Sequence, residues 1–432
     1  MKFDQSIRLY QEASKVIPMG TSTFSRSPAL YSIGSSPLYI QSAKGCRVRD
    51  VDGNEFIDYA MALAIVTLGY ANPEIIEAAR QGLEDGMIFT LSCPEEAALA
   101  RKINEVVPCA DMVRFFKSGS DSCEGAVKLA RAFTGKQKIL TMRECWHGFH
   151  DWFLASTARN RGIPAEMSEW ILPHSYNDLE GIKRTIESRA SEIAAVMLEP
   201  LITVEPAPGF LEGLRALTEA HNIVLIFDEM KTGFRLHVGG GQAYFGVTPD
   251  LAVFGKGLSN GLPLSALVGK RKLMQQFEDA SCLMSGSYAT EKASLLAGLK
   301  TIEILQRGEA IPHIWRTGRR LKAGLEEIVH KHNLGHAIRV VGLAPMQHLV
   351  FSPAGDVTVA DMRAYLQQEC VKRGVLFVGY HHTSFAHTDQ DIDTTLAVYG
   401  EAFGLLADAL RVGDLKARLA GKATTLSGVR KE

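Results

Sequence analysis

The 432-residue sequence lacks an excess of charge of either sign, since 47 Lys and Arg face 48 Asp and Glu, for a formal net charge of -1. Without a basic or acidic surplus, there is no electrostatic reason to expect nucleic acid or an anionic membrane as a partner. No apolar run reaches the roughly 18 residues of a membrane span. The opening MKFDQSIRLYQEASKVIP has no apolar centre of a signal peptide, so we expect a cytoplasmic protein.

Paired cysteines are also missing. The seven cysteines are scattered and form no Cys-x-x-Cys pair: Cys46, Cys93, Cys109, Cys123, Cys145, Cys282 and Cys370. This pattern indicates neither a zinc site nor a disulfide framework, and reduced, buried thiols are the expected state. The acidic stretch around Asp52-Gly53-Asn54 has its glycine at the wrong position for a calcium loop and predicts a hairpin turn instead. We expect no metal site.

The order of the elements indicates an α/β fold. Helix-like and strand-like stretches alternate, and IVLIFDE (223–229) and LAVF (251–254) are apolar enough to be buried on both faces. Strands buried on both faces are typical of a parallel sheet between helices. Because the chain is too long for one core, we expect a large domain and a smaller one.

The ends of the chain have a different character from its middle. A hairpin pattern precedes residue 60, and long helical patterns after about residue 300 are followed by short strand-like stretches. We therefore predict an N-terminal segment and hairpin at 1–60, a large domain at 61–305 and a smaller α+β domain at 306–432. The N-terminal segment is expected to join the smaller domain.

Polar side chains follow the predicted strands. Lys117-Ser118-Gly119-Ser120 comes after MVRFF, Glu199 after AAVML, Asp228 after IVLIF and Lys256 after LAVF. Ligands of open parallel sheets bind outside the carboxyl ends of the strands, so we expect these groups to lie along one edge.

The stretch Ser118-Gly119-Ser120 leads into a predicted helix. Free N–H groups and the helix dipole at such a turn bind anions, most often phosphate. The alternative is that Ser120 simply caps the helix.

Asp228 and Lys256 complete a possible cofactor site. A carboxylate behind an apolar strand needs a partner, either within the protein or as a cationic nitrogen of a ligand. A lysine at a dry strand end has a lowered pKa and a neutral amine that can form a Schiff base, although a snorkelling surface lysine is the alternative. A phosphate cradle, a carboxylate and such a lysine together are the anchors of pyridoxal phosphate (PLP).

The stretches FFKSGSDSCEGAVKLARAFTGKQKI, CWHGFHD, GFLEGLRALTEAHNIVLIFDEMKTGFR and GVTPDLAVFGKGLSNGLP resemble the class-III aminotransferases of PLP fold type I. The similarity is greatest to the glutamate-1-semialdehyde 2,1-aminomutase branch, and it covers nearly the whole chain. It implies that Lys256 bears the cofactor and moves a proton, while Asp228 holds the ring nitrogen protonated. It also implies cofactor contacts from Ser118, Gly119, Ser120, Trp146, His147, Glu199 and Met230, with Trp146 and Met230 on opposite faces of the ring.

The same resemblance implies a homodimer with shared active sites, because Ser287 aligns with a residue that completes the phosphate site of the neighbouring subunit. It assigns Arg26 to the substrate carboxylate, although a surface arginine is an equal alternative. Tyr380 and His381, with His382, are candidates for substrate contact; a solvated loop is the alternative for the two histidines.

Four departures from the family pattern concern the substrate pocket. Thr290-Glu291-Lys292 replaces Gly-Asn-Pro, and Leu63 replaces the tryptophan of the aminomutase. The loop after Glu199 lacks the usual asparagine, and the segment at Tyr380 lacks the glutamate-bearing insertion. These differences argue against glutamate-1-semialdehyde as the substrate.

The sequence thus predicts an enzyme that transfers an amino group between an amino acid and a carbonyl substrate through Lys256. An aminomutase, an epimerase or an ammonia-lyase on the same scaffold is the alternative. A binding protein that has lost catalysis is a third reading, against which the lysine counts. The sequence does not identify the amino donor or acceptor.

Overall fold

The computed structural model of the protein describes residues 1–420. The chain divides into two units. Unit 1 comprises Met1–Leu63, Leu68–Asn72 and the chain from Pro312 onward, and unit 2 comprises Ala64–Thr67 and Pro73–Ile311. The predicted division at 305 and 306 falls at the end of a helix, whereas the two units divide after Ile311.

Unit 2 is built on a seven-stranded sheet in the order β4-β10-β9-β8-β7-β5-β6. The strands are β4 (Met112–Phe116), β5 (Lys138–Met142), β6 (Ile171–His174), β7 (Ile193–Leu198), β8 (Val224–Asp228), β9 (Leu251–Phe254) and β10 (Ser265–Gly269). Only β10 runs against its neighbours β4 and β9, so the other six strands point the same way. The predicted α/β class with a mainly parallel sheet is confirmed.

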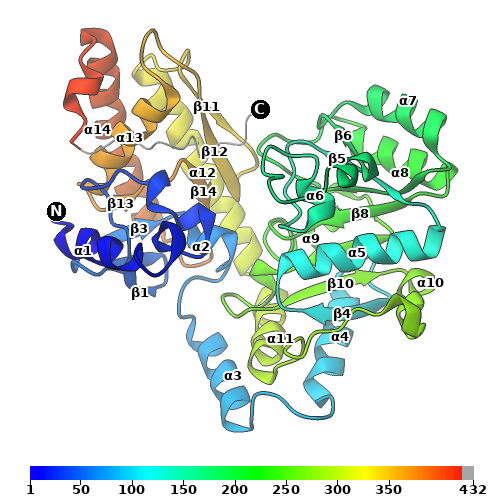
Figure 1. The fold of residues 1–432 in the computed structure, drawn as a ribbon. Helices are drawn as coiled ribbons and strands as arrows, with labels where there is room; N and C mark the ends of the chain where they lie inside the picture. The colour runs from blue at the N-terminus through cyan, green and yellow to red at the C-terminus, as the bar shows by residue number, and fades with distance from the viewer. Residues whose placement is uncertain (421–432) are drawn as a thin grey trace. The chain divides into compact units, whose positions relative to one another are not determined.

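The helices of unit 2 pack on its sheet or on one another. They are α3 (Pro73–Glu84), α4 (Pro94–Val106), α5 (Gly119–Thr134), α6 (Asp151–Leu154), α7 (Leu179–Arg189), α8 (Phe210–Ala220), α9 (Gly240–Phe245), α10 (Arg271–Met274) and α11 (Lys292–Gln306). Figure 1 shows α5 lying across the sheet, where it packs on β9 and β10. Ala126, Leu129 and Ala130 are buried as their spacing predicts, but Phe133 is 39% exposed because it lies in the last turn of α5.

Unit 1 contains two small sheets. One has the order β1-β2-β3-β13 and the other the order β11-β12-β14. Their strands are β1 (Ile40–Lys44), β2 (Arg47–Asp50), β3 (Glu55–Asp58), β11 (Ile338–Val341), β12 (Met346–Phe351), β13 (Val375–Leu376) and β14 (Tyr380–His382). The hairpin predicted around Asp52-Gly53-Asn54 is the β2–β3 connection, where Gly53 has a φ of 89°.

Helices pack against these sheets: α1 (Asp4–Ala13), α12 (Ala310–Lys331), α13 (Val359–Val371) and α14 (Asp389–Val412). The core of the unit joins residues from both chain ends, including Ile57, Tyr59, Leu366 and Tyr399. A short turn, α2 (Met61–Ala64), has φ values of 46°, 54°, 67° and 67°, so it is left-handed, and Leu63 lies in it.

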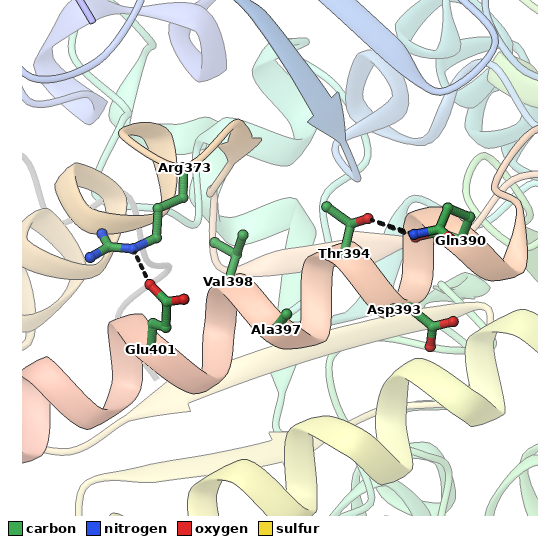
Figure 2. A pocket seen from close by; sticks show the side chains of 7 residues that line it. All are labelled: Arg373, Gln390, Asp393, Thr394, Ala397, Val398 and Glu401. Carbon is green, nitrogen blue, oxygen red and sulfur yellow. Dashed lines mark hydrogen bonds and ion pairs between the residues drawn. The ribbon is translucent and has the colours of Figure 1, made fainter.

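A shallow groove runs along the exposed side of α14 (Figure 2). Arg373 donates to Glu401 across one end, and Gln390 faces Thr394 at the other. None of the residues predicted for the cofactor or the substrate lines this groove. We therefore assign it no part in the candidate site.

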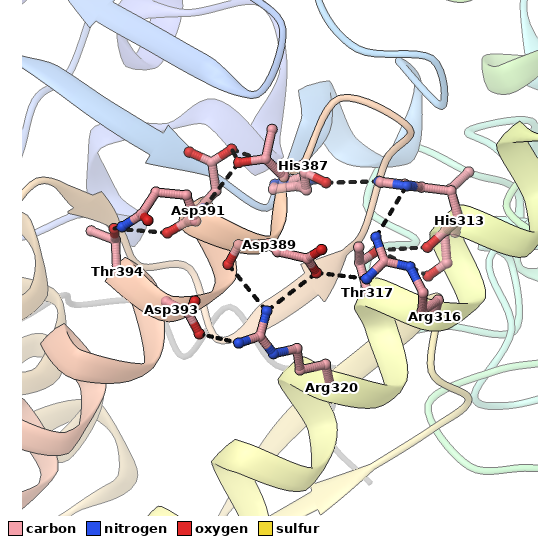
Figure 3. Close-up of polar contacts among 12 residues, drawn as sticks. His313, Arg316, Thr317, Arg320, His387, Asp389, Asp391, Asp393 and Thr394 are labelled. Carbon is pink, nitrogen blue, oxygen red and sulfur yellow. Dashed lines mark hydrogen bonds and ion pairs between the residues drawn. The ribbon is translucent and has the colours of Figure 1, made fainter.

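An ion-pair network joins α12 to the start of α14 (Figure 3). Arg316 and Arg320 both donate to Asp389, at 2.6 and 3.2 Å, and Arg320 also contacts Asp393. His313 Nε2 faces the carbonyl oxygen of His387 at 2.8 Å. Because these charged side chains are exposed, solvent screens the ion pairs and they contribute little to the stability of unit 1. In the described part of the chain, no helix is both long and apolar enough for a membrane span.

Candidate functional site

The carboxyl ends of the parallel strands of unit 2 gather the predicted polar groups. Lys117 follows β4, Glu199 follows β7, Asp228 ends β8 and Lys256 comes two residues after β9. Since β4 runs parallel to these strands with β10 between, all four positions lie at the same edge of the sheet. This arrangement is where open α/β sheets bind their ligands.

The turn Ser118-Gly119-Ser120 opens α5 with a capping box. The Ser118 side chain accepts from the backbone N–H of Asp121 at 3.2 Å, while the Asp121 carboxylate accepts from the Ser118 N–H at 2.9 Å. Ser118, and not Ser120, is therefore the capping residue. The Ser120 hydroxyl instead accepts the N–H of Phe149 at 3.3 Å, and the α5 terminus keeps the dipole that favours an anion.

Asp228 is only 2% exposed and is held from two sides. Its Oδ1 accepts the N–H of Met230 at 3.0 Å, and its Oδ2 lies 2.8 Å from His147 Nδ1 and 3.7 Å from Cys123 Sγ. Burial, followed by the charge of Asp228, raises the pKa of the Cys123 thiol, so the thiol is protonated and donates. Ligand atoms of Cys123, His147 and Asp228 lie within 4.8 Å of one another, and we interpret them as a hydrogen-bonded group around the carboxylate.

The neighbouring acid, Glu229, has a separate task. It is fully buried and accepts the N–H groups of Gly241 and Gln242, at 2.6 and 2.8 Å, at the start of α9. Burial raises its pKa, while these hydrogen bonds oppose the rise. Glu229 thus holds the fold together, and only Asp228 faces the cluster at the sheet edge.

Trp146 is positioned through its backbone. Its N–H donates to Glu199 Oε1 at 2.8 Å, and Glu199 in turn forms an ion pair with Lys231. The indole ring packs edge-on against Phe153 at 5.5 Å and is 38% exposed. The Arg159 guanidinium lies 5.4 Å from the ring centre.

Met230 links the phosphate turn to the segment that holds Lys256. A Cβ atom added to Gly119 would lie 2.9 Å from Met230 Sδ, and one added to Gly255 would lie 2.7 Å from it, so the sulfur packs directly on both glycines. Lys256 itself is half-buried and begins a short 3₁₀ turn with a φ of 44°. A left-handed lysine is uncommon and is typical of strained functional sites.

Ser287 lies in the exposed loop that precedes α11. The neighbouring loop after α3 contacts the same region, because Lys292 N donates to the Met87 carbonyl at 2.8 Å. Tyr288 is 68% exposed beside it.

The predicted substrate residues all lie in unit 1. Arg26 is exposed. Burial, followed by the charges of Tyr31 and Asp58, raises the pKa of Tyr380, and the charges of Arg363 and Arg26 oppose this rise. Arg26 and Tyr380 are therefore close enough to interact electrostatically.

His381 lies on β14 and is 1% exposed, with Nε2 2.8 Å from the Tyr399 hydroxyl. Burial, with the charges of His348 and His387, lowers the pKa of His381 to about 3. These contacts favour a role in the core over a contact with substrate, and they are at odds with a solvated loop.

Sequence reasoning missed Cys123 and Lys231. Cys123 lies one turn into α5 among its buried residues. The helical spacing to Ala126 and Ala130 is the signal that could have placed it on the buried side. Nothing in the sequence pattern pairs Lys231 with Glu199, because the two are brought together only by adjacent strand ends.

Residues 31–388 match the family model described as aminotransferase class-III. The chain is 33% identical over 411 residues to the 3-aminobutyryl-CoA aminotransferase of Cloacimonas acidaminovorans (strain Evry), which covers 93% of this chain and 97% of that protein. It is 34% identical over 420 residues to the glutamate-1-semialdehyde 2,1-aminomutase of Methanococcoides burtonii, with 92% and 98% covered.

Among solved structures, the FumI protein of Sphingopyxis sp. MTA144 in its PLP internal aldimine form is similar, with a TM-score of 0.88 and 29% identity over 97% of this chain and 99% of that chain. The fold agrees with the family match. The chain therefore belongs to the class-III aminotransferases, enzymes of PLP fold type I that use pyridoxal phosphate.

Proposed function

We propose that this enzyme is an aminotransferase in which Lys256 attaches the cofactor and Asp228 holds its ring nitrogen. The observation that carries the proposal is the placement of a buried carboxylate, a strained lysine and a helix N-terminus along one edge of the sheet. A protonated ring nitrogen supplies the positive partner that a buried carboxylate needs.

The residues present fit pyridoxal phosphate. At the phosphate end, a Cβ atom on Gly148 would lie 2.4 Å from Ser120 Oγ, so only a glycine fits beside that hydroxyl. Gly119 and Ser120 offer N–H groups at the start of α5 for the phosphate. We assign the phosphate to Ser118, Gly119 and Ser120.

When bound, pyridoxal phosphate supplies an aldehyde for an amine and an electron-withdrawing ring. Asp228, fixed by the Met230 N–H and His147, keeps the proton on the ring nitrogen. Lys256 Nζ accepts the proton that leaves the substrate carbon and later returns it. Trp146, held through Glu199, and Met230 would press on opposite faces of the ring and exclude water from it.

We further propose a homodimer in the cytoplasm, with Ser287 of one subunit completing the phosphate site of the other. Apolar side chains support an interface on unit 2, since Phe89 is 46% and Leu91 81% exposed on the loop that contacts the start of α11. All seven cysteines are buried and free, as a reducing compartment would keep them.

We infer that the amino substrate carries an acid group or an acid derivative, with Arg26 as its anchor and Tyr380 beside it. The 3-aminobutyryl-CoA aminotransferase among the relatives supports an amine on the carbon next but one to the carbonyl group. The relative named as an aminomutase supports the second candidate, in which the amino group returns to the same carbon skeleton.

The deciding experiment treats the purified holoenzyme with borohydride and maps the modified residue by mass spectrometry. We expect the adduct on Lys256, and the Lys256→Ala variant to lose it together with turnover. An adduct elsewhere, or a variant as active as the parent enzyme, contradicts the proposal.

A panel of amino donors then separates the two candidates. An aminotransferase converts its bound cofactor stoichiometrically to the amine form and releases a keto product without an added acceptor. An aminomutase gives an isomer of its substrate, and release of free ammonia indicates a lyase.

A further inference from the structure

Lys117 lies immediately before the phosphate turn, and it is held in two places. Its Nζ donates to Glu291 at 2.9 Å and to the carbonyl oxygen of Pro263 at 2.9 Å. Its side chain is 22% exposed. Burial lowers the pKa of Lys117, whereas Glu291 raises it, so the carboxylate is what keeps a half-buried ammonium favourable.

Glu291 is the capping residue of α11. Its carboxylate is 9% exposed and accepts the N–H of Ser294 at 3.2 Å, as well as the Lys117 ammonium. The Ser294 hydroxyl also donates to the Pro263 carbonyl at 3.2 Å. Glu291, four residues after Ser287, thereby ties the start of α11 to Lys117.

The same node reaches the segment that follows Lys256. Pro263 lies in the stretch between Lys256 and β10, and Ser265 at the start of β10 donates to the Ser118 carbonyl at 2.6 Å. Three pieces of chain that carry the phosphate turn, Lys256 and Ser287 are thus joined by one polar cluster. Glu291 also stands where the family pattern has asparagine, so the ion pair belongs to this chain's own version of the site.

We propose that Lys117 and Glu291 are positioning residues, whose ion pair sets the phosphate turn against the loop that carries Ser287. This proposal rests on the proposed function, because it takes Ser118–Ser120 as ligands of the subunit's own phosphate and Ser287 as a ligand of the phosphate in the other subunit. The pair acts on the phosphate end of the cofactor and leaves the ring end, at Asp228, to other residues. Breaking one side leaves an uncompensated charge beside the turn, whereas removing both charges does not.

The test compares two ligands that differ only in the phosphate group, pyridoxal phosphate and pyridoxal. Dissociation constants are measured for cofactor-free full-length protein and for the variants Lys117→Met, Glu291→Gln and the double variant. Arg307→Met is the control, since it removes an exposed ion pair with Glu74 in the same unit, with side chains 50% and 43% exposed. Thermal midpoints and the ³¹P resonance of the bound phosphate are recorded alongside.

We expect Lys117→Met to weaken pyridoxal phosphate at least about tenfold and to leave pyridoxal within about twofold, because the Glu291 charge then lies unpaired near the phosphate. The double variant should recover part of that loss, and the ³¹P resonance should move in Lys117→Met. The control should bind both ligands as the parent protein does.

The proposal is overturned if Lys117→Met leaves the ratio of the two dissociation constants unchanged, whether neither ligand is weakened or both are weakened equally. If Lys117→Met does not fold, Lys117→Arg and Glu291→Gln decide. Lys117→Arg should keep the ratio of the two dissociation constants, and Glu291→Gln should change it. The reverse result contradicts the proposal. A parent protein that never binds pyridoxal phosphate is a failure of the proposed function and not of this ion pair.

Discussion

At the scale of single residues, two adjacent acids have opposite roles. Asp228 ends β8 in contact with His147 and Cys123, whereas Glu229 caps α9 from the other side of the strand. The two side chains of consecutive residues point to opposite faces at a strand end. One acid is therefore available to a ligand, and the other is committed to the fold.

We expect Asp228→Asn to lower turnover by about 10²–10³-fold, because a neutral amide does not stabilise the ring proton. Its thermal midpoint should stay close to that of the parent protein. Glu229→Gln is the matched variant and should lower the midpoint, since it weakens the hydrogen bonds to Gly241 and Gln242. Steady-state rates and differential scanning calorimetry on both variants check this; an active Asp228→Asn enzyme contradicts the assignment.

The sequence predicted which residues end the strands, but not the pairs that lock them. Lys256, Asp228 and Glu199 follow or end short apolar runs that indicate buried strands. The ion pair Lys231–Glu199 depends on which strand ends are neighbours in space, and the ion pair Lys117–Glu291 depends on where α11 begins relative to β4. Charged residues in loops have no period that would reveal such partners.

At the scale of elements, the loop between β5 and α6 depends on one glycine. Gly148 has a φ of 101°, and a Cβ atom there would lie 2.4 Å from Ser120 Oγ. Gly162, farther along the chain, has a φ of 90° with nothing within 4 Å. Both positions carry backbone strain for alanine, and only the first also meets the phosphate turn.

We expect Gly148→Ala to weaken pyridoxal phosphate at least about tenfold, because the methyl group displaces the Ser120 hydroxyl. Gly162→Ala should cost about 1 kcal/mol of stability from the left-handed backbone and leave cofactor affinity unchanged. Cofactor titration and thermal unfolding of the two variants separate the effects. Equal affinity losses would mean that strain alone, and not the clash, is responsible.

Strand β14 shows where the sequence pattern misled. Tyr380-His381-His382 has the composition of a polar loop, but it pairs with β12, and His381 packs between Tyr59 and Tyr399. The partners come from residues 59 and 399, so no local signal could indicate burial of the ring.

This burial makes stability depend on pH. The pKa of His381 is about 3 in the folded protein, against 6.5 for an ordinary histidine, so only the unfolded chain takes up the proton between these values. Stability is therefore full above pH 6.5 and falls as the pH drops toward 3.

His381→Gln, which can still bond to the Tyr399 hydroxyl, should lose about 2–3 kcal/mol less stability than the parent protein between pH 7 and pH 4.5. His336→Gln, at an exposed histidine, should behave like the parent. Urea unfolding at the two pH values measures the difference. The same pH dependence in His381→Gln and parent protein would remove His381 from the account.

At the scale of the whole molecule, the alternation of elements predicted the fold class, and the family match and the sheet order agree with it. The antiparallel strand β10 was not predicted, since SALVG has the same composition whichever way it runs. The periodicity of the sequence also gives no information on assembly, and the homodimer remains a prediction.

We expect the double substitution Phe89→Glu and Leu91→Glu to give a monomer that retains cofactor poorly, because Ser287 of the second subunit is lost. Val412→Glu, at a residue of α14 that is 53% exposed, is the control and should leave the assembly intact. Sedimentation velocity reports the assembly. A parent protein that is monomeric yet fully active contradicts the shared site.

The position of β10 has a consequence for biosynthesis. Strand β4 lies at the margin of the large sheet, and its partner β10 comes so late that the bonded residues Ser118 and Ser265 are 147 positions apart. During synthesis on the ribosome, the stretch MVRFF of β4 therefore has no β10 to pair with until more than a third of the chain has been added. A nascent chain halted before residue 265 carries an open strand edge, which is a template for aggregation and a reason for chaperones to bind it.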